Sequence, residues 1–193
     1  MIRFLTLLFL LLTHAVLADE TKKSAIDPWE KRINENGVLE IEWDDLAPAD
    51  FDPDELFQSI TEKYSIDELA DDDPRAQQIQ SEIDDIWSNA PVVKSLDGRK
   101  VRLPGLIIPL EGDGKRVSEF LLVPYFGACI HVPPPPSNQI VYVTDDSKKA
   151  EVREVYDAVW VTGTLRIDHN HRDMGDSSYS IVADMVMPYE EEE

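Results

Sequence analysis

Cysteine is almost absent from this chain, which contains a single one, Cys129, among 193 residues. No disulfide bond can therefore form within the chain. An unpaired cysteine is commonly a small buried side chain, a metal ligand or a thiol available for intermolecular chemistry. The role of Cys129 is therefore the first functional question that the sequence raises.

Basic residues are also scarce. The chain has 18 lysines and arginines against 39 aspartates and glutamates, which gives a formal net charge of −21 at pH 7. A chain this acidic repels nucleic-acid phosphates and anionic lipid headgroups. We therefore expect no nucleic-acid partner and no direct membrane insertion of the mature chain, and high solubility is the simplest consequence of the charge.

Long apolar runs are missing as well. The longest, Phe4–Leu12, follows Arg3 and leads into small residues that end at Ala18. A membrane-spanning helix needs roughly 20 apolar residues, whereas this pattern is typical of a cleaved secretory signal. We expect residues 1–18 to be a signal peptide cleaved after Ala18, so that the mature protein is periplasmic. An uncleaved N-terminal anchor is the alternative.

Catalytic signatures do not occur either. The sequence has no Walker loop, dinucleotide fingerprint, Gly-x-Ser-x-Gly elbow or His-Glu-x-x-His helix. We therefore expect a binding or accessory protein and not an enzyme. A nucleophilic Cys129 activated by His131 is the alternative.

The first part of the mature chain, residues 19–90, is predicted to be an acidic, partly helical extension. One helix is expected from Asp54 to about Tyr64. A second should follow Asp73, which can cap its first turn, with Pro74 at the first helical position. Its apolar residues recur at helical spacing and predict a face that docks against the following domain. These residues are Ile79, Ile83, Ile86 and Trp87.

The pattern changes to β over residues 91–189. A tight-turn signal, Asp97-Gly98, precedes the first long strand, and Gly163 lies inside a later one. The strands are expected at 100–110, 119–124, 139–143, 158–167 and 179–188. We predict an α+β, mainly β fold in which a small OB-like five-stranded β-barrel follows the helical extension. A β-sandwich is the alternative, and residues 190–193 form an acidic tail.

Two pairs of potential metal ligands stand out. Cys129 and His131 are two residues apart, so in an extended segment both side chains project from one face. Every other histidine of the mature chain belongs to the second pair, His169 and His171. One thiolate and three imidazoles suit a tetrahedral zinc or copper site. We predict these four residues as ligands of zinc, and Cys129 with His131 and a different third ligand is the narrower alternative.

Other interpretations of the same residues stay open. Cys129 could be a buried core residue, His131 a structural histidine, and the second pair part of a polar hairpin loop. The prolines after His131 form a stiff polyproline II segment, which could instead dock a membrane-protein partner without any metal. The residues predicted for such docking are Tyr125, Phe126, Pro133, Pro134, Pro135 and Pro136.

Several motifs in this chain resemble those of the DUF3299 family, exported bacterial proteins of unknown function. The matching segments are Trp43-x-x-Leu46, Leu96–Leu110, Phe120–Gln139, Trp160–Gly163 and Pro188-Tyr189. The block Cys-Ile-His-Val-Pro-Pro-Pro-Pro is specific to that family. The resemblance implies a periplasmic accessory protein, associated with ABC-transporter components and with zinc supply, in which Cys129 and His131 occupy the family's own Cys-x-His positions.

Overall fold

The computed structural model describes residues 27–66, 73–113, 116–125, 135–146, 150–151, 157–171 and 175–189. The chain divides into two compact units, Met1–Lys31 and Arg32–Glu193. The short 3-10 helix η1 (Glu30–Arg32) lies where the first unit ends.

Seven strands, two α-helices and three further short 3-10 helices make up the described part of the second unit. In chain order they are β1 (Leu39–Glu40), η2 (Trp43–Leu46), α1 (Pro53–Tyr64), α2 (Arg75–Ser88), η4 (Lys94–Leu96), β2 (Lys100–Gly112), β3 (Arg116–Val123), η5 (Ser137–Gln139), β4 (Val141–Thr144), β5 (Ala150–Glu151), β6 (Ala158–Asn170) and β7 (Ser177–Pro188).

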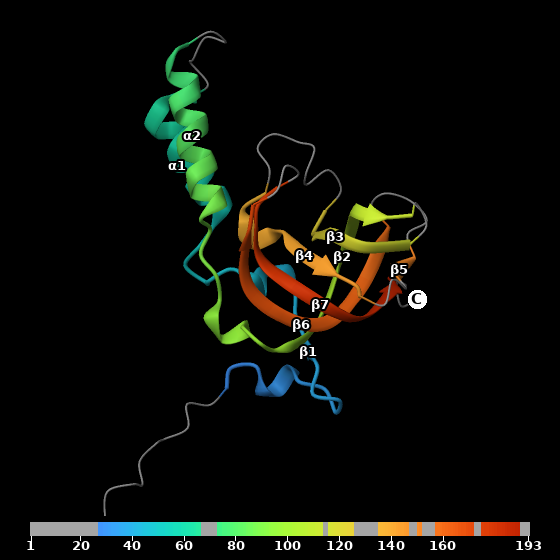
Figure 1. Ribbon diagram of the computed structural model, residues 1–193. Helices are drawn as coiled ribbons and strands as arrows, with labels where there is room; N and C mark the ends of the chain where they lie inside the picture. Colours follow the sequence, from blue (N-terminus) through green and yellow to red (C-terminus); the bar gives the residue numbers. More distant parts are fainter. Residues whose placement is uncertain are drawn as a thin grey trace, which may run out of the picture. The chain divides into compact units, whose positions relative to one another are not determined.

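Five of these strands close into a barrel (Figure 1). The order around it is β2, β6, β7, β4 and β3, and β3 pairs back onto β2. Strands β4 and β7 run parallel, with Val141 opposite Tyr179, and the other four pairings are antiparallel. This is the strand order of an OB barrel. The prediction of a mainly β, OB-like barrel is confirmed, and the sandwich alternative is not what forms.

The barrel also incorporates part of the predicted extension. Strand β1 pairs in parallel with the first residues of β2, placing Leu39 opposite Val101. The side chains of Leu39, Ile41 and Leu46 are almost completely buried. The residues around β1 therefore complete the barrel's core, because they cover the half of β2 that β3 does not reach.

The barrel interior follows the alternation of its strands. On β6, Val159, Val161 and Leu165 are buried while the residues between them are partly exposed. Gly163 falls in the same inward series. A Cβ atom there would lie 2.3 Å from the carbonyl oxygen of Val182. The glycine is thus required because β6 and β7 approach each other too closely for a side chain at a bulge in their pairing.

A second buried cluster lies on the other face of β2, β3 and β4. In sheet proteins, alternate residues point to opposite faces, and here both faces of β3 are buried from Phe120 to Val123. The cluster consists of Ile108, Leu121, Val123, Ile140 and Tyr142. The Tyr142 hydroxyl donates a hydrogen bond to Glu119 at 2.5 Å.

The two helices form a hairpin with a small core of its own. Helix α1 matches its predicted limits to within one residue, whereas α2 begins at Arg75, so that Pro74 is its N-cap and not its first helical residue. Asp73 Oδ1 accepts the Arg75 backbone N–H at 2.8 Å. The apolar stripe of α2 packs against α1, where Ile60 joins the cluster, and not against the β domain as predicted. The buried members of this cluster are Ile60, Ile79, Ile83 and Trp87.

The predicted turn at Asp97-Gly98 forms and leads into β2. Gly98 has φ +77°, a left-handed conformation that favours glycine, and its N–H donates to the Leu165 carbonyl at 2.8 Å. The residues just before the turn form the short 3-10 helix η4. No helix within the described ranges is long and apolar enough to cross a membrane.

Candidate functional site

Two chain connections leave and re-enter the barrel at the same end. One joins the end of β3 at Val123 to the start of β4 at Val141, and it contains Cys129 and His131 in the sequence. The other joins β6 to β7 and contains His171. Because β4 and β7 are parallel neighbours, with Val141 opposite Tyr179, their starts lie side by side. We call this the Cys–His end of the barrel.

The segment that leads into β4 is firmly packed at this end. Pro135 and Pro136 are buried, and Pro136 has φ −57° and ψ 150°, close to polyproline II geometry. The Ser137 and Ser178 hydroxyls are 2.7 Å apart, a contact that ties the segment to β7. Asn138 Nδ2 also donates to the Pro91 carbonyl at 2.9 Å. The last part of the proline run is therefore an anchored support.

Buried polar groups gather at the same place. Asn138 is 0% exposed and Ser177 is 2% exposed. Within the described part of the chain, neither Asn138 Oδ1 nor Ser177 Oγ has a hydrogen-bond partner. Unpaired buried polar atoms are uncommon in folded proteins, so the Cys–His end differs in polarity from the aliphatic interior of the barrel.

The second predicted ligand pair lies at this end too. His169 lies near the end of β6, where the pairing with β7 is irregular between Ile167 and Asn170, and His171 follows β6 directly; both histidines are exposed. His171 Nδ1 is 2.5 Å from Asp176 Oδ1, and the imidazole is 90% exposed. A carboxylate on one ring nitrogen fixes the orientation of the ring and leaves Nε2 available to a ligand.

Asp176 is a residue that the sequence reading missed. It lies across the β6–β7 connection from His171, five residues along the chain. Only the hairpin geometry brings the two together. A short His-to-Asp spacing in a polar loop was the sole signal in the sequence, and it is too common to single out.

Several predicted site residues lie outside the described part of the chain. These residues are Phe126, Cys129, His131, Pro133 and Pro134. Among the described residues, no group of three or more His, Cys, Asp or Glu side chains is arranged to hold a metal ion. Of the predicted docking residues, Tyr125 is 53% exposed whereas Pro135 and Pro136 are buried. Any docking face in the described region would therefore use Tyr125 and not these two prolines.

Comparison with known proteins gives a family and a fold. The profile of the family described as "Protein of unknown function (DUF3299)" matches residues 43–188. The crystal structure of a DUF3299 family protein from Pseudomonas aeruginosa PAO1 is similar, with 38% sequence identity and a TM-score of 0.59. The match covers 81% of this chain and 99% of that one. A search of curated proteins finds no match.

Proposed function

The protein belongs to the DUF3299 family, and from this premise we propose that it is a periplasmic accessory protein that binds zinc and serves an ABC-type transport system. The observation that supports the metal-binding proposal is that the starts of β4 and β7, where the two connections re-enter the barrel, lie side by side. One contains Cys129 and His131, the other contains His171, and His169 precedes it at the end of β6.

Ligand chemistry supports zinc in particular. Thiolate and imidazole are the usual ligands of zinc, which binds them in tetrahedral sets. The chain offers one thiol and, after removal of the signal peptide, three imidazoles, and all four are on these two connections or beside them. Asp176 supplies the outer carboxylate that zinc-binding histidines commonly have.

Zinc content of the purified mature chain tests the proposal. The chain beginning at Asp19, prepared under reducing and chelator-free conditions, should bind zinc at about one ion per chain by elemental analysis and calorimetry. Cys129→Ala/His131→Ala should lose this binding. A matched control is Met185→Ala/Met187→Ala, which removes two exposed residues of the same spacing from β7. Negligible zinc in the unaltered chain, or equal zinc in both double variants, would overturn the proposal.

Asp176 permits a finer test. Asp176→Asn keeps the size of the side chain but removes its charge, and should weaken zinc binding by about tenfold. Asp168→Asn is the control, because Asp168 lies near His169 but accepts a hydrogen bond from Asn170 and not from a histidine. If Asp176→Asn binds zinc as tightly as Asp168→Asn, Asp176 does not contribute to the zinc site.

Export and transport are tested separately. The proposed cleavage after Ala18 predicts that protein from the periplasmic fraction begins at Asp19, which intact-mass analysis would read directly. Deletion of the gene should slow growth under zinc limitation in the same way as deletion of the transporter. Growth that is unchanged when zinc is withheld would contradict the transport role.

The second candidate function is a metal-free interaction module. The observation that favours it is the exposure of Tyr125, an aromatic side chain at the start of the proline-containing connection. In that case Tyr125→Ala should abolish capture of a membrane-protein partner, and Cys129→Ala/His131→Ala should leave it intact. Zinc-dependent capture would favour the first proposal instead.

A further inference from the structure

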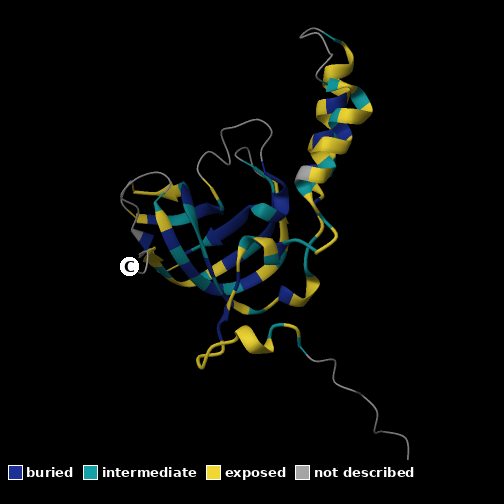
Figure 2. Cartoon of the chain, turned by 180° about the vertical axis from the view of Figure 1, so that it is seen from behind, coloured by how far each residue is buried: buried dark blue, intermediate teal, exposed yellow. Residues whose placement is uncertain are grey.

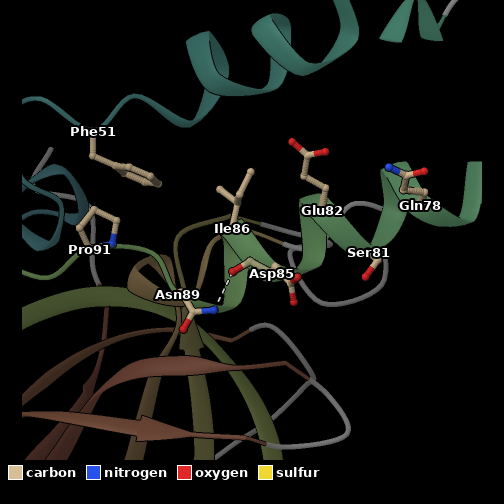
Figure 3. Close-up of a pocket in the computed structure, with 8 residues that line it drawn as sticks. All are labelled: Phe51, Gln78, Ser81, Glu82, Asp85, Ile86, Asn89 and Pro91. Carbon is tan, nitrogen blue, oxygen red and sulfur yellow. Dashed lines mark hydrogen bonds between the residues drawn. The ribbon is translucent and has the colours of Figure 1, made fainter. Parts of the chain in front are cut away.

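The helical hairpin carries an open groove along α2, with a volume of about 760 Å³. Figure 3 shows Phe51 and Pro91 together at one end, Ile86 and Asp85 beside them, and Glu82 farther along α2. The lining residues on the helix recur at helical spacing, so they occupy one face of α2. These are Gln78, Ser81, Glu82, Asp85, Ile86 and Asn89.

The groove combines an apolar end with an acidic wall. Phe51, Ile86 and Pro91 are the apolar lining residues, and none of the eight lining residues is basic. Glu82 receives hydrogen bonds from Lys63 Nζ, at 2.7 Å, and from the Tyr64 hydroxyl. These bonds hold the pKa of Glu82 below its usual value, so its carboxylate stays ionised.

Asp85 differs from Glu82 in its surroundings. Among the described residues, no ion pair involves the Asp85 carboxylate, and the hydrogen bond from Asn89 Nδ2 goes to the Asp85 backbone carbonyl at 2.7 Å. Asp85 is exposed. It therefore offers a negative charge to a cation from outside the chain.

Charge around the groove points the same way. Between Ala47 and Pro91 the sequence has 13 acidic residues and two basic ones. Both basic side chains are already in ion pairs, Lys63 with Glu82 and Arg75 with Asp73. About half of the net charge of the chain is therefore concentrated in this hairpin and its flanks, and such a field attracts cationic partners and raises their rate of association.

We propose that this groove docks a basic segment of a partner protein. The segment places an apolar side chain against Phe51, Ile86 and Pro91, and a lysine or arginine against Asp85. The apolar end distinguishes this ligand from a bare metal ion, the acidic wall excludes nucleic acid, and a second copy of the chain would bring a further net charge of −21. The interaction does not depend on the Cys–His end or on zinc.

A synthetic peptide of lysine and phenylalanine residues is a direct probe. Its binding to the mature chain, followed by fluorescence anisotropy, should be measurable at low salt and weaken as salt is raised. The same peptide with glutamate in place of lysine should not bind. No binding of the lysine peptide, or equal binding of both peptides, would overturn the proposal.

Two charge reversals on α2 separate the groove from the general field. Asp85→Lys and Asp84→Lys change the net charge equally and are neighbours on the helix, but only Asp85 lines the groove. Asp85→Lys should weaken the peptide by about tenfold or more, and Asp84→Lys by less than about threefold. Equal losses would show that the peptide senses the overall charge alone and would overturn the groove as its site.

A third variant controls for misfolding as the cause of weaker peptide binding. Ser81 is exposed and lines the groove without contributing to the hairpin's core. Ser81→Lys should weaken the peptide in the same direction as Asp85→Lys while leaving the helical circular dichroism unchanged. A Ser81 variant with full helicity and undiminished peptide binding would count against the groove.

Discussion

The barrel and the helical hairpin are built on different principles, although they belong to one unit of the chain. The barrel closes its hydrogen-bonding pattern on itself, and several of its largest side chains, such as Phe120 and Tyr179, are 0% exposed. The hairpin buries only one stripe on each helix, and its core residues retain 3–6% exposure. Figure 2 shows the contrast: buried segments recur along the barrel strands, whereas the helices are largely exposed.

This contrast indicates where the chain can change. In the barrel, inward residues are buried among neighbours on several strands, so substitutions there disturb the packing. The hairpin depends on a few contacts, and the rest of its surface is available for charge. We infer that the barrel provides the framework and that the hairpin provides an adjustable surface.

One buried hydroxyl of the barrel bonds to the chain on both sides of the helical hairpin. Tyr179 on β7 donates to the Leu46 carbonyl at 2.8 Å and accepts the Val93 N–H at 2.7 Å. Leu46 precedes the hairpin and Val93 follows it. The whole helical excursion thus begins and returns at one buried side chain of the barrel.

The largest expected effect comes from the barrel's interior. Phe120→Ala should lower the free energy of unfolding by about 3–5 kcal/mol, because it leaves a cavity that the closed strands cannot fill. Phe57→Ala is the matched control on α1, where the ring is 37% exposed. It should cost less than about 1 kcal/mol. Urea unfolding measures the free energy of unfolding of both variants. Similar losses would contradict the distinction between a tightly packed barrel and an adjustable hairpin.

A smaller and more local effect is expected in the hairpin's core. Ile83→Ala should cost about 2 kcal/mol, near the lower end for such a change, because its site is at the edge of a small cluster. Hydrogen exchange should show faster exchange in α1 and α2 but unchanged protection in β6 and β7. If the strands lose protection to the same degree, the two regions unfold together and the hairpin is not separable.

The contact of Tyr179 with both ends of the hairpin should show a smaller loss than either core. Tyr179→Phe removes both hydrogen bonds of the hydroxyl and should cost about 1–2 kcal/mol. Hydrogen exchange should reveal the loss at Val93 and in the residues after Leu46 before it appears in the barrel. Unchanged exchange at both points would mean that the hydroxyl does not hold the ends of the hairpin.

Tyr179 also predicts an alkaline transition. Burial raises the pKa of Tyr179 to about 12, although the Val93 N–H acts in the opposite direction. The unfolded state therefore loses the proton first, near the ordinary pKa of about 10. The stabilisation is complete below pH 10 and is lost as pH rises towards 12. The stability difference between the unaltered chain and Tyr179→Phe should narrow over that interval.

Sequence patterns located the regular elements well. The five barrel strands and both helices begin within a few residues of the expected positions, because alternation and helical spacing report directly on which face is buried. The turn at Asp97-Gly98 was also predicted, whereas the 3-10 helix η4 that precedes it was not. There, Gly98 bonds to Leu165 of β6, a long-range partner that no local pattern reveals.

Long-range packing explains what the sequence could not provide. The apolar stripe on α2 predicted a buried face. Its spacing does not distinguish the barrel from α1 as the partner, and in the structure the partner is α1. The pairing of Asp176 with His171 and the groove beside Asp85 likewise depend on three-dimensional approach. The chemistry of the Cys–His end was visible as residue types, whereas the adjacency of its two connections needed the parallel β4–β7 pairing.

The smallest expected effect concerns the start of α2 and tests whether the hairpin responds to a substitution independently of the barrel. Hydrogen bonds from the Arg75 side chain and backbone lower the pKa of Asp73 to about 2. The unfolded state takes up the proton near pH 4, so this stabilisation is present above pH 4 and is lost as pH falls towards 2. Asp73→Asn should therefore speed hydrogen exchange in the first turn of α2 at neutral pH. The stability of that turn should then no longer fall as the pH is lowered from 4 towards 2. Asp84→Asn, on the same helix but away from the cap, should change neither, and a barrel response to Asp73→Asn would show that the cap supports more than its own helix.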